Sequence, residues 1–244
     1  MVLALPDRDM ERILVIIAHP DDAEFWVGGT VAQWTDSGIQ VTYCVLTDGS
    51  GGGFDPDIPR PEIPHIRRAE QQQAAKLLGV SEVRFFGLGE QSLMDDRHEL
   101  HEDLVRVIRQ VRPQRVVCQS PERNWARLPA SHPDHMAAGE ATLQAVYPDA
   151  RNPFAHPVLF EEEGLDAWAV PEVWVMGSPR PDHWVDITDT FSSKIAALRA
   201  HVSQTGHQDE LERTMRQWGE ANARLGGLPE GVLAEGFMVV TVPI

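Results

Sequence analysis

The sequence of 244 residues has few cysteines and no long apolar run. Its two cysteines, Cys44 and Cys118, lie in separate strand-like runs and far from any C-x-x-C spacing, so we expect buried thiols and no disulfide. No run of about 18 apolar residues is present. The N-terminus also lacks the basic and apolar regions of a signal peptide. These absences predict a cytoplasmic protein in a reducing compartment.

Positive charge is scarce as well. The chain has 21 Lys and Arg residues against 37 Asp and Glu, which gives a formal net charge of −16. A surface of this sign repels phosphate backbones and anionic lipids. We therefore expect no nucleic-acid or membrane partner and a small-molecule substrate instead. The composition leaves homo-oligomerisation open.

Strand-like and helical patterns alternate through the first 150 residues. This alternation predicts a single Rossmann-like α/β domain, 1–244, with a mostly parallel sheet flanked by helices. The second half is expected to add strands and helices to the same sheet. Strands are predicted at 13–18, 40–46, 82–87, 114–119, 172–177, 183–187 and 237–242, and helices at 24–37, 65–78, 98–111, from 135 onward, 188–201 and 208–225.

A Gly-rich and Pro-rich loop, TDGSGGGFDPDIPRPEIP, occupies residues 47–64. Loops of this length without regular structure are usually functional or disordered. No G-x-G-x-x-G follows the first strand and no G-K-[ST] is present, so a nucleotide site is disfavoured. We expect this loop to cover a substrate.

Polar residues follow the first apolar run directly, in the segment AHPDDAE at 18–24. Ligands of open α/β sheets bind beyond the carboxyl ends of the strands, which is where His19, Asp21 and Asp22 fall. Adjacent carboxylates at a buried strand end are unfavourable unless something binds them. A divalent cation would do so, with His19 and Asp22 as its first two ligands.

A second segment, HPDH at 132–135, follows the fourth strand and opens a helix. A catalytic zinc site needs three protein ligands and an open position. We expect His135 to supply the third ligand and His132 to face the substrate.

Together AHPDDAE, GGT at 28–30, TDG at 47–49 and HPDH resemble the LmbE-like or PIG-L deacetylases. VDIT at 185–188, AHVSQ at 200–204 and AEGF at 234–237 extend the similarity over nearly the whole chain. The family includes N-acetylglucosaminyl-phosphatidylinositol de-N-acetylases and the deacetylases and amidases of mycothiol and bacillithiol metabolism. The resemblance implies a Rossmann-like fold and a zinc-dependent hydrolase.

The resemblance also implies roles for single residues. The positions that match the zinc ligands are His19, Asp22 and His135. Asp21 matches the general base, and His132 matches the histidine that stabilises the oxyanion and protonates the leaving amine. Asp134 is expected to be the carboxylate partner that keeps His132 charged and oriented.

Substrate contacts are implied less specifically. Arg67 resembles a substrate-binding arginine, with the adjacent Arg68 as an alternative, and Asp48 of TDG is expected nearby. Glu24, displaced by one position from the family's H-P-D-D-E pattern, is expected to cap the helix or to support the site. His183 repeats the Pro-Asp-His order, and its role is left open.

The sequence thus predicts an N-deacetylase that releases acetate from an N-acetylated amino sugar of the GlcNAc type or from its conjugate. An amidase acting on a thiol conjugate or an antibiotic precursor is an alternative. Fe²⁺ could replace Zn²⁺ in the same site, and two histidines with a carboxylate also describe the iron oxygenases, which use a double-stranded β-helix. A non-catalytic ligand-binding protein of the same fold is the remaining alternative.

Overall fold

The computed structural model describes residues 4–89, 93 and 97–243; for residues 97–99 it describes the backbone only. The alternating pattern of the sequence becomes one seven-stranded sheet in the order β3-β2-β1-β4-β5-β7-β6. The strands are β1 (Arg12–Ile17), β2 (Gln40–Thr47), β3 (Glu82–Leu88), β4 (Arg115–Gln119), β5 (Glu172–Met176), β6 (His183–Asp186) and β7 (Ala234–Thr241). All seven predicted strands are present within a few residues of their expected bounds.

The sheet is mostly parallel. Strands β3, β2, β1, β4 and β5 run parallel to one another. Strand β7 is antiparallel to β5, and β6 is antiparallel to β7, so the second half of the chain completes the same sheet. The prediction of one α/β domain with a mostly parallel sheet is confirmed. The double-stranded β-helix that the oxygenase hypothesis requires does not occur in the described part of the chain.

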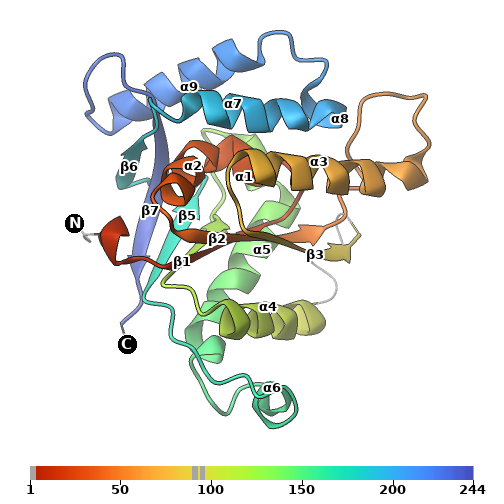
Figure 1. Cartoon of the computed structure of the whole chain (residues 1–244), viewed down its shortest axis with the longest axis vertical. Coiled ribbons are helices and arrows are strands. Elements are labelled where there is room, and N and C mark those ends of the chain that lie inside the picture. Colours follow the sequence, from red (N-terminus) through yellow and green to blue (C-terminus); the bar gives the residue numbers. More distant parts are fainter. Residues whose placement is uncertain (1–3, 90–92, 94–96, 244) are drawn as a thin grey trace.

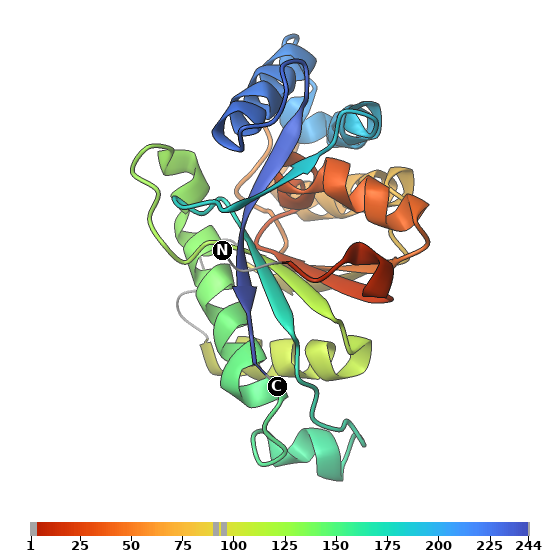
Figure 2. The ribbon, with the colours of Figure 1, turned by 90° about the vertical axis from the view of Figure 1, so that its left-hand side faces the viewer.

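Helices cover both faces of the sheet (Figure 1). One face carries the helices of the N-terminal and C-terminal parts, and the other carries the middle ones, an arrangement that Figure 2 shows from the side. The first group is α1 (Asp22–Trp26), α2 (Gly28–Asp36), α3 (Ile63–Leu77), α7 (Phe191–Ala200), α8 (Val202–Thr205) and α9 (Leu211–Leu225); the second is α4 (Arg97–Val111), α5 (Pro133–Gln144) and α6 (Pro157–Glu161).

Strand β1 lies in the interior of the sheet, which explains why its sequence from Ile13 to Ile17 is continuously apolar. Its side chains from Ile13 to Ile17 are all fully buried. Ile13, Val15 and Ile17 pack into the core beneath α2, whereas Leu14 and Ile16 pack into the core above α4 and α5. A parallel strand covered on both faces shows no polar alternation. The first polar residues after it therefore fall at the edge of the sheet.

The helix predicted at 24–37 is broken at Val27 into α1 and α2. A Cβ on Gly29 would come within 2.8 Å of Ile187, so this position needs glycine. The buried carboxylate of Glu235 accepts hydrogen bonds from the amides of Gly29 (3.0 Å) and Thr30 (2.8 Å). It also pairs with Lys194 at 2.5 Å. An acidic side chain at a helix N-terminus satisfies exposed amides and interacts favourably with the helix dipole, and here it comes from a distant strand.

Other differences are local. The 47–64 loop is shorter than predicted, because a 3-10 turn at Arg60–Glu62 leads into α3 at Ile63. An irregular segment, η5 (Ala145–Ala150), follows α5 and has an extended backbone at Tyr147, and α6 occupies a Pro-rich region for which no helix was predicted. Both cysteines are buried thiols, as expected.

The stability of a Gly139 variant reports how closely α5 must approach β4. A Cβ at this position would overlap the carbonyl oxygen of Gln119 at the end of β4. Gly139→Ala should lower the free energy of unfolding by about 1–3 kcal/mol, measured by denaturant titration, because backbone has to move. In Gly28→Ala the nearest contact would be an ordinary 3.5 Å, so this matched variant should keep or gain stability. Equal stability of the two variants would contradict the close approach.

Candidate functional site

The two polar motifs lie at neighbouring strand ends. Strands β1 and β4 pair in parallel at the centre of the sheet, so their carboxyl ends lie at the same edge. The first motif follows β1 and begins α1, and the second precedes and begins α5. In the sheet, β2 is the neighbour of β1 on one side and β4 is its neighbour on the other, so the strand order changes direction at β1. This is the position at which open α/β sheets form a crevice for ligands.

Side-chain atoms of the three predicted ligands converge there. His19 Nδ1 lies 3.2 Å from His135 Nε2, and Asp22 Oδ1 lies 3.1 Å from the same nitrogen. Asp22 Oδ2 is 3.4 Å from His19 Nδ1. Ligands about 2.0–2.1 Å from a tetrahedral Zn²⁺ are roughly 3.3 Å apart, so these spacings suit a bound ion. The side chains are almost fully buried and two of them are imidazoles, a donor set suited to Zn²⁺ or Fe²⁺.

Polar side chains behind the ligands hold them in place. Asp134 Oδ2 lies 3.1 Å from His19 Nε2, which directs the other nitrogen of that ring toward the cluster. The amide of Gln119 donates to Asp22 Oδ2 at 2.9 Å, and its oxygen accepts from the backbone amide of Ala18. Carboxylates and amides in such positions fix ring orientation and ligand basicity in metal sites.

The predicted pairing of Asp134 with His132 is wrong in the structure. Residue 134 begins α5, and its fully buried carboxylate contacts His19 instead. His132 Nδ1 accepts a hydrogen bond from the backbone amide of Asp134 at 3.2 Å. An accepting Nδ1 carries no proton, so a neutral His132 has its proton on Nε2. Burial and the neighbouring His19 and His135 lower the pKa of His132, although the charges of Asp134 and Asp22 oppose the shift.

His132 nevertheless belongs to the same cluster. A nitrogen of each of the three histidines His19, His132 and His135 lies within 4.8 Å of the others. The rings of His19 and His132 stand nearly perpendicular with centroids 4.9 Å apart. His132 is less buried than the other two, which fits its predicted position facing a substrate.

Asp21 sits in an unusual backbone conformation between the motif's proline and the first helix. Its φ is 95°, in the left-handed region that non-glycine residues rarely adopt. The oxygen of the Gln71 side chain accepts from its amide at 2.8 Å, and Arg67 Nη2 lies 3.2 Å from its Oδ2. Burial raises the pKa of Asp21 to about 6, although the charge of Arg67 opposes the rise and that of Asp22 adds to it.

Gln71 belongs to a buried row of side-chain contacts, from Gln71 to Glu24 to His201, that the two sequence motifs did not reveal. Its amide donates to Glu24 Oε1 at 2.9 Å, and Glu24 Oε2 lies 3.1 Å from His201 Nε2. Glu24 is thus a supporting residue, one of its two predicted roles. His201 falls within AHVSQ and Gln71 on the helix after Arg67, but one sequence offers no signal that α3 and α7 meet at this point.

Arg67 is buried, with 3% of its surface exposed. Its guanidinium donates to the carbonyl oxygens of Pro20 (2.5 Å) and Gly49 (2.9 Å) and contacts Asp21. In the structure it therefore joins the first motif to the loop after β2. A Cβ on Gly49, whose φ is 68°, would lie 2.7 Å from Arg67, so the loop needs glycine here. Direct binding of a substrate by Arg67 stays a prediction.

Asp48, the second residue predicted to contact substrate, and Arg68, the alternative to Arg67, lie near Pro20. Exposed Arg68 stacks over the ring of Phe85 at 4.2 Å, and Asp48 accepts a hydrogen bond from the amide of Ser50 at 2.9 Å. Both line a small cavity of about 140 Å³ beside Pro20. A substrate role for Asp48 or Arg68 stays a prediction. His183 is not brought to the cluster, because it begins β6 and packs on Trp174.

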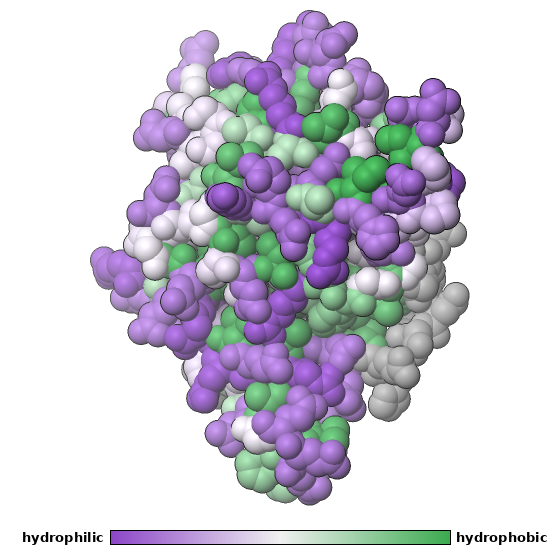
Figure 3. All heavy atoms as spheres, turned by 45° about the vertical axis from the view of Figure 1, so that its right-hand side comes forward, coloured by the Kyte–Doolittle hydropathy of each residue, from purple (hydrophilic) through white to green (hydrophobic). Residues whose placement is uncertain are grey.

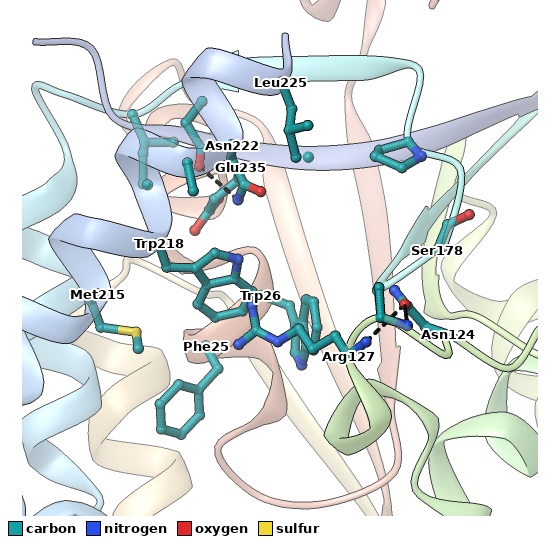
Figure 4. Close-up of a pocket in the computed structure, with 18 of the residues that line it drawn as sticks. Phe25, Trp26, Asn124, Arg127, Ser178, Met215, Trp218, Asn222, Leu225 and Glu235 are labelled. Atoms are coloured by element: carbon teal, nitrogen blue, oxygen red, sulfur yellow. Dashed lines mark hydrogen bonds between the residues drawn. The ribbon is translucent and has the colours of Figure 1, made fainter.

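A larger cavity of about 330 Å³ opens beside α1 and α9 (Figure 4). The rings of Trp26 and Trp218 meet edge to face, with centroids 4.8 Å apart. The guanidinium of Arg127 lies 3.6 Å from the centroid of the Trp218 ring. The cavity has no wall residue from the histidine cluster among the described residues. Trp26 follows the first motif and Arg127 precedes the second, so the segments that carry the cluster also build this cavity.

Among the described residues, no helix is both long and apolar enough to cross a membrane. On the face drawn in Figure 3, hydrophilic side chains predominate and hydrophobic ones are scattered among them.

The comparison with known families agrees with this geometry. The model of the GlcNAc-PI de-N-acetylase (PIG-L) family matches residues 14–146, a range that contains both motifs. The chain belongs to the PIG-L family. The match ends near η5, and the PIG-L segment accordingly holds β1 to β4 with α1 to α5.

Several proteins similar to this PIG-L chain carry deacetylase names. It is 36% identical over 200 residues to the diacetylchitobiose deacetylase of Thermococcus kodakarensis, covering 82% of this chain and 72% of that one. It is 34% identical over 203 residues to a probable N-acetyl-alpha-D-glucosaminyl L-malate deacetylase 2 of Bacillus cereus, covering 80% and 85%. The solved N,N'-diacetylchitobiose deacetylase of Pyrococcus horikoshii, in complex with an inhibitor, superposes with a TM-score of 0.87 at 28% identity, covering 97% of this chain and 86% of that one.

The corrected position of Asp134 makes a prediction. Asp134→Asn should weaken metal binding about 10–100-fold, because a neutral amide polarises the His19 ring less than a carboxylate does. Competition with a chromophoric chelator measures this affinity. Glu140→Gln removes an exposed carboxylate from the same helix and should leave affinity unchanged. If Asp134→Asn leaves metal affinity unaltered but slows turnover, Asp134 would act through His132 and not through His19.

Proposed function

We propose that this protein is a zinc-dependent N-deacetylase that hydrolyses the acetamido group of a GlcNAc-type sugar or its conjugate. The observation that carries the proposal is the convergence of His19 Nδ1, Asp22 and His135 Nε2 within 3.1–3.4 Å, with Asp21 and His132 beside them. The deacetylase names of the relatives support the reaction class.

The residues present fit the metal. His19, Asp22 and His135 would hold it, and Asp134 and Gln119 would support two of these ligands. Bound Zn²⁺ would lower the pKa of water and polarise the amide carbonyl. Fe²⁺ accepts the same donors, so metal analysis of the purified protein decides between the two ions.

Asp21 is the proposed general base. It is adjacent to a ligand in the chain, but its side chain is held away by Arg67, which binds Oδ2. Oδ1 remains to accept the proton of the attacking water and to return it to the leaving amine. Gln71 holds the amide of Asp21 in the left-handed conformation that turns this side chain away from its neighbour.

His132 is the proposed oxyanion donor. With Nδ1 accepting the amide of Asp134, the proton on Nε2 is available to the developing negative charge. A neutral imidazole is a sufficient donor, since the hydrogen bond strengthens as charge forms on the oxygen. His132 therefore acts by donating a hydrogen bond, and the proton of the leaving amine comes from Asp21.

The GlcNAc-type substrate rests on the relatives and on the cavity beside α1. The Thermococcus protein is named for diacetylchitobiose and the Bacillus protein for a glucosaminyl malate. The Trp26 and Trp218 rings line a cavity large enough for a sugar or an aglycone, together with polar side chains such as Asn222. Thiol-conjugated amides and acylated antibiotic precursors are the alternative substrates.

Release of free amine from a substrate panel tests the function. The panel contains GlcNAc, diacetylchitobiose, GlcNAc-malate, GlcNAc-inositol and N-acylated thiol conjugates. The zinc-loaded protein should release amine and acetate from at least one acetamido sugar. Asp21→Asn should retain the metal and lose most turnover, about 10²–10⁴-fold, because it removes the proton acceptor. Silence across the acetamido sugars, or full activity of Asp21→Asn, would overturn the proposal.

His132→Ala separates the oxyanion donor from the metal ligands. We expect turnover to fall about 10²–10³-fold while the metal stays bound, because the developing charge loses one donor. Turnover and metal content are measured on the same preparation, and His135→Ala serves as the variant that should lose the metal. Loss of metal in His132→Ala would show that the roles of the two histidines are exchanged.

A further inference from the structure

A second group of histidine and carboxylate side chains lies away from both motifs. His101 is on α4, Asp149 is in η5, and His156 directly precedes α6. One ligand atom from each of the three residues lies within 4.8 Å of the other two. His101 Nδ1 is 3.6 Å and His156 Nε2 is 3.4 Å from Asp149 Oδ2. These spacings are close to the roughly 3.3 Å expected between ligands of a tetrahedral Zn²⁺.

The ring of His156 is oriented as a metal ligand would be. Its Nδ1 lies 3.3 Å from Glu102 Oε2, on the residue next to His101. When Nδ1 donates to this carboxylate, the lone pair on Nε2 is directed at Asp149 and His101. A carboxylate behind a histidine ligand is a recurrent feature of zinc sites. Asp134 behind His19 gives the same arrangement in the catalytic cluster.

Arg109 holds the segment that carries two of these residues. It lies on the same helix as His101 and is 98% buried, with 2% of its surface exposed. Its guanidinium donates to the backbone carbonyl oxygens of Asp149, Ala150, Asn152 and Ala155, at distances of 2.8–3.3 Å. The backbone on both sides of the group is therefore fixed before any ion binds. A preorganised backbone lowers the entropy lost on binding.

The charges around the group favour a bound cation. Arg106 is shared among the carboxylates of Glu102, Asp103 and Glu163. With Asp149, these carboxylates outnumber the guanidinium groups of Arg106 and Arg109. The rings of His101 and His156 lie with centroids 5.6 Å apart, so a single divalent ion could contact both rings and the carboxylate of Asp149.

We propose that His101, Asp149 and His156 form a second Zn²⁺ site, which joins α4 to the segment between η5 and α6. The side chains are 13–22% exposed, so an ion can enter and a water molecule can complete the coordination. The site shares no residue with the catalytic cluster. Its role is structural, because the ion would link α4 to the segment that leads into α6, in the lower part of Figure 1.

Metal counting in single and double variants tests the second site. After treatment with a chelator, the protein is equilibrated with Zn²⁺ and the bound metal is quantified. Wild type should bind about two ions per chain, and His135→Ala and His101→Ala about one each. The double variant should bind close to none. His207→Ala removes an exposed histidine and should still bind two.

Glu102→Gln gives a milder test that keeps all three ligands. In the His135→Ala background it should weaken the remaining Zn²⁺ site about 10–100-fold, because the His156 ring loses its carboxylate partner. Zn²⁺ should raise the Tm of His135→Ala and have little effect once His101→Ala is added. A single ion in wild type that His135→Ala removes, or an unchanged ion count and Tm response when His101→Ala is added, would overturn the second site. Either result would leave the proposed deacetylase function standing, because amine release from acetamido sugars is measured separately from the metal count.

Discussion

The parallel pairing of β1 with β4 is the constraint on which the site depends. It brings the two carboxyl ends to one edge of the sheet and so places the segments after Ile17 and Gln119 side by side. Gln119, at the end of β4, then holds the segment that follows β1, since its side chain accepts from the amide of Ala18 and donates to Asp22. The close approach of α5, which Gly139 permits, carries His135 to the same point. A small displacement of either element would separate the ligand atoms.

Buried polar groups are arranged in supporting pairs around this edge. Unpaired charges in such a place would be strongly destabilising, and the carboxylates of Asp22, Asp134 and Glu24 each contact a histidine. Behind Asp21 the pairs are Gln71 with Glu24 and Glu24 with His201. Burial alone would lower the pKa of His201, but the hydrogen bond and charge of Glu24 raise it above its ordinary value. The helices of the N-terminal and C-terminal parts are thereby joined directly behind Asp21, the proposed general base.

The predictions from sequence succeeded where local pattern and strand order decide the outcome. The apolar run of β1 required burial on both faces, and the polar residues that follow it had to fall at the sheet edge. His19, Asp22 and His135 could be grouped for this reason. The break at Val27 escaped prediction because it depends on Ile187 and Glu235, far away in the chain. Asp134 was assigned to the wrong histidine, because spacing along a helix does not show which ring lies across from it.

By itself the sequence determined the fold class, the two motifs and the kind of donor atoms they offer, since these follow from hydrophobic periodicity and residue chemistry. The tertiary structure alone decided which donors face one another: Asp134 with His19, Arg67 with Asp21, Glu24 with His201. It also brought His101, Asp149 and His156 together from three elements. The physical reason is that such contacts depend on distances of a few ångströms between helices, which packing of the whole core sets and no local pattern encodes.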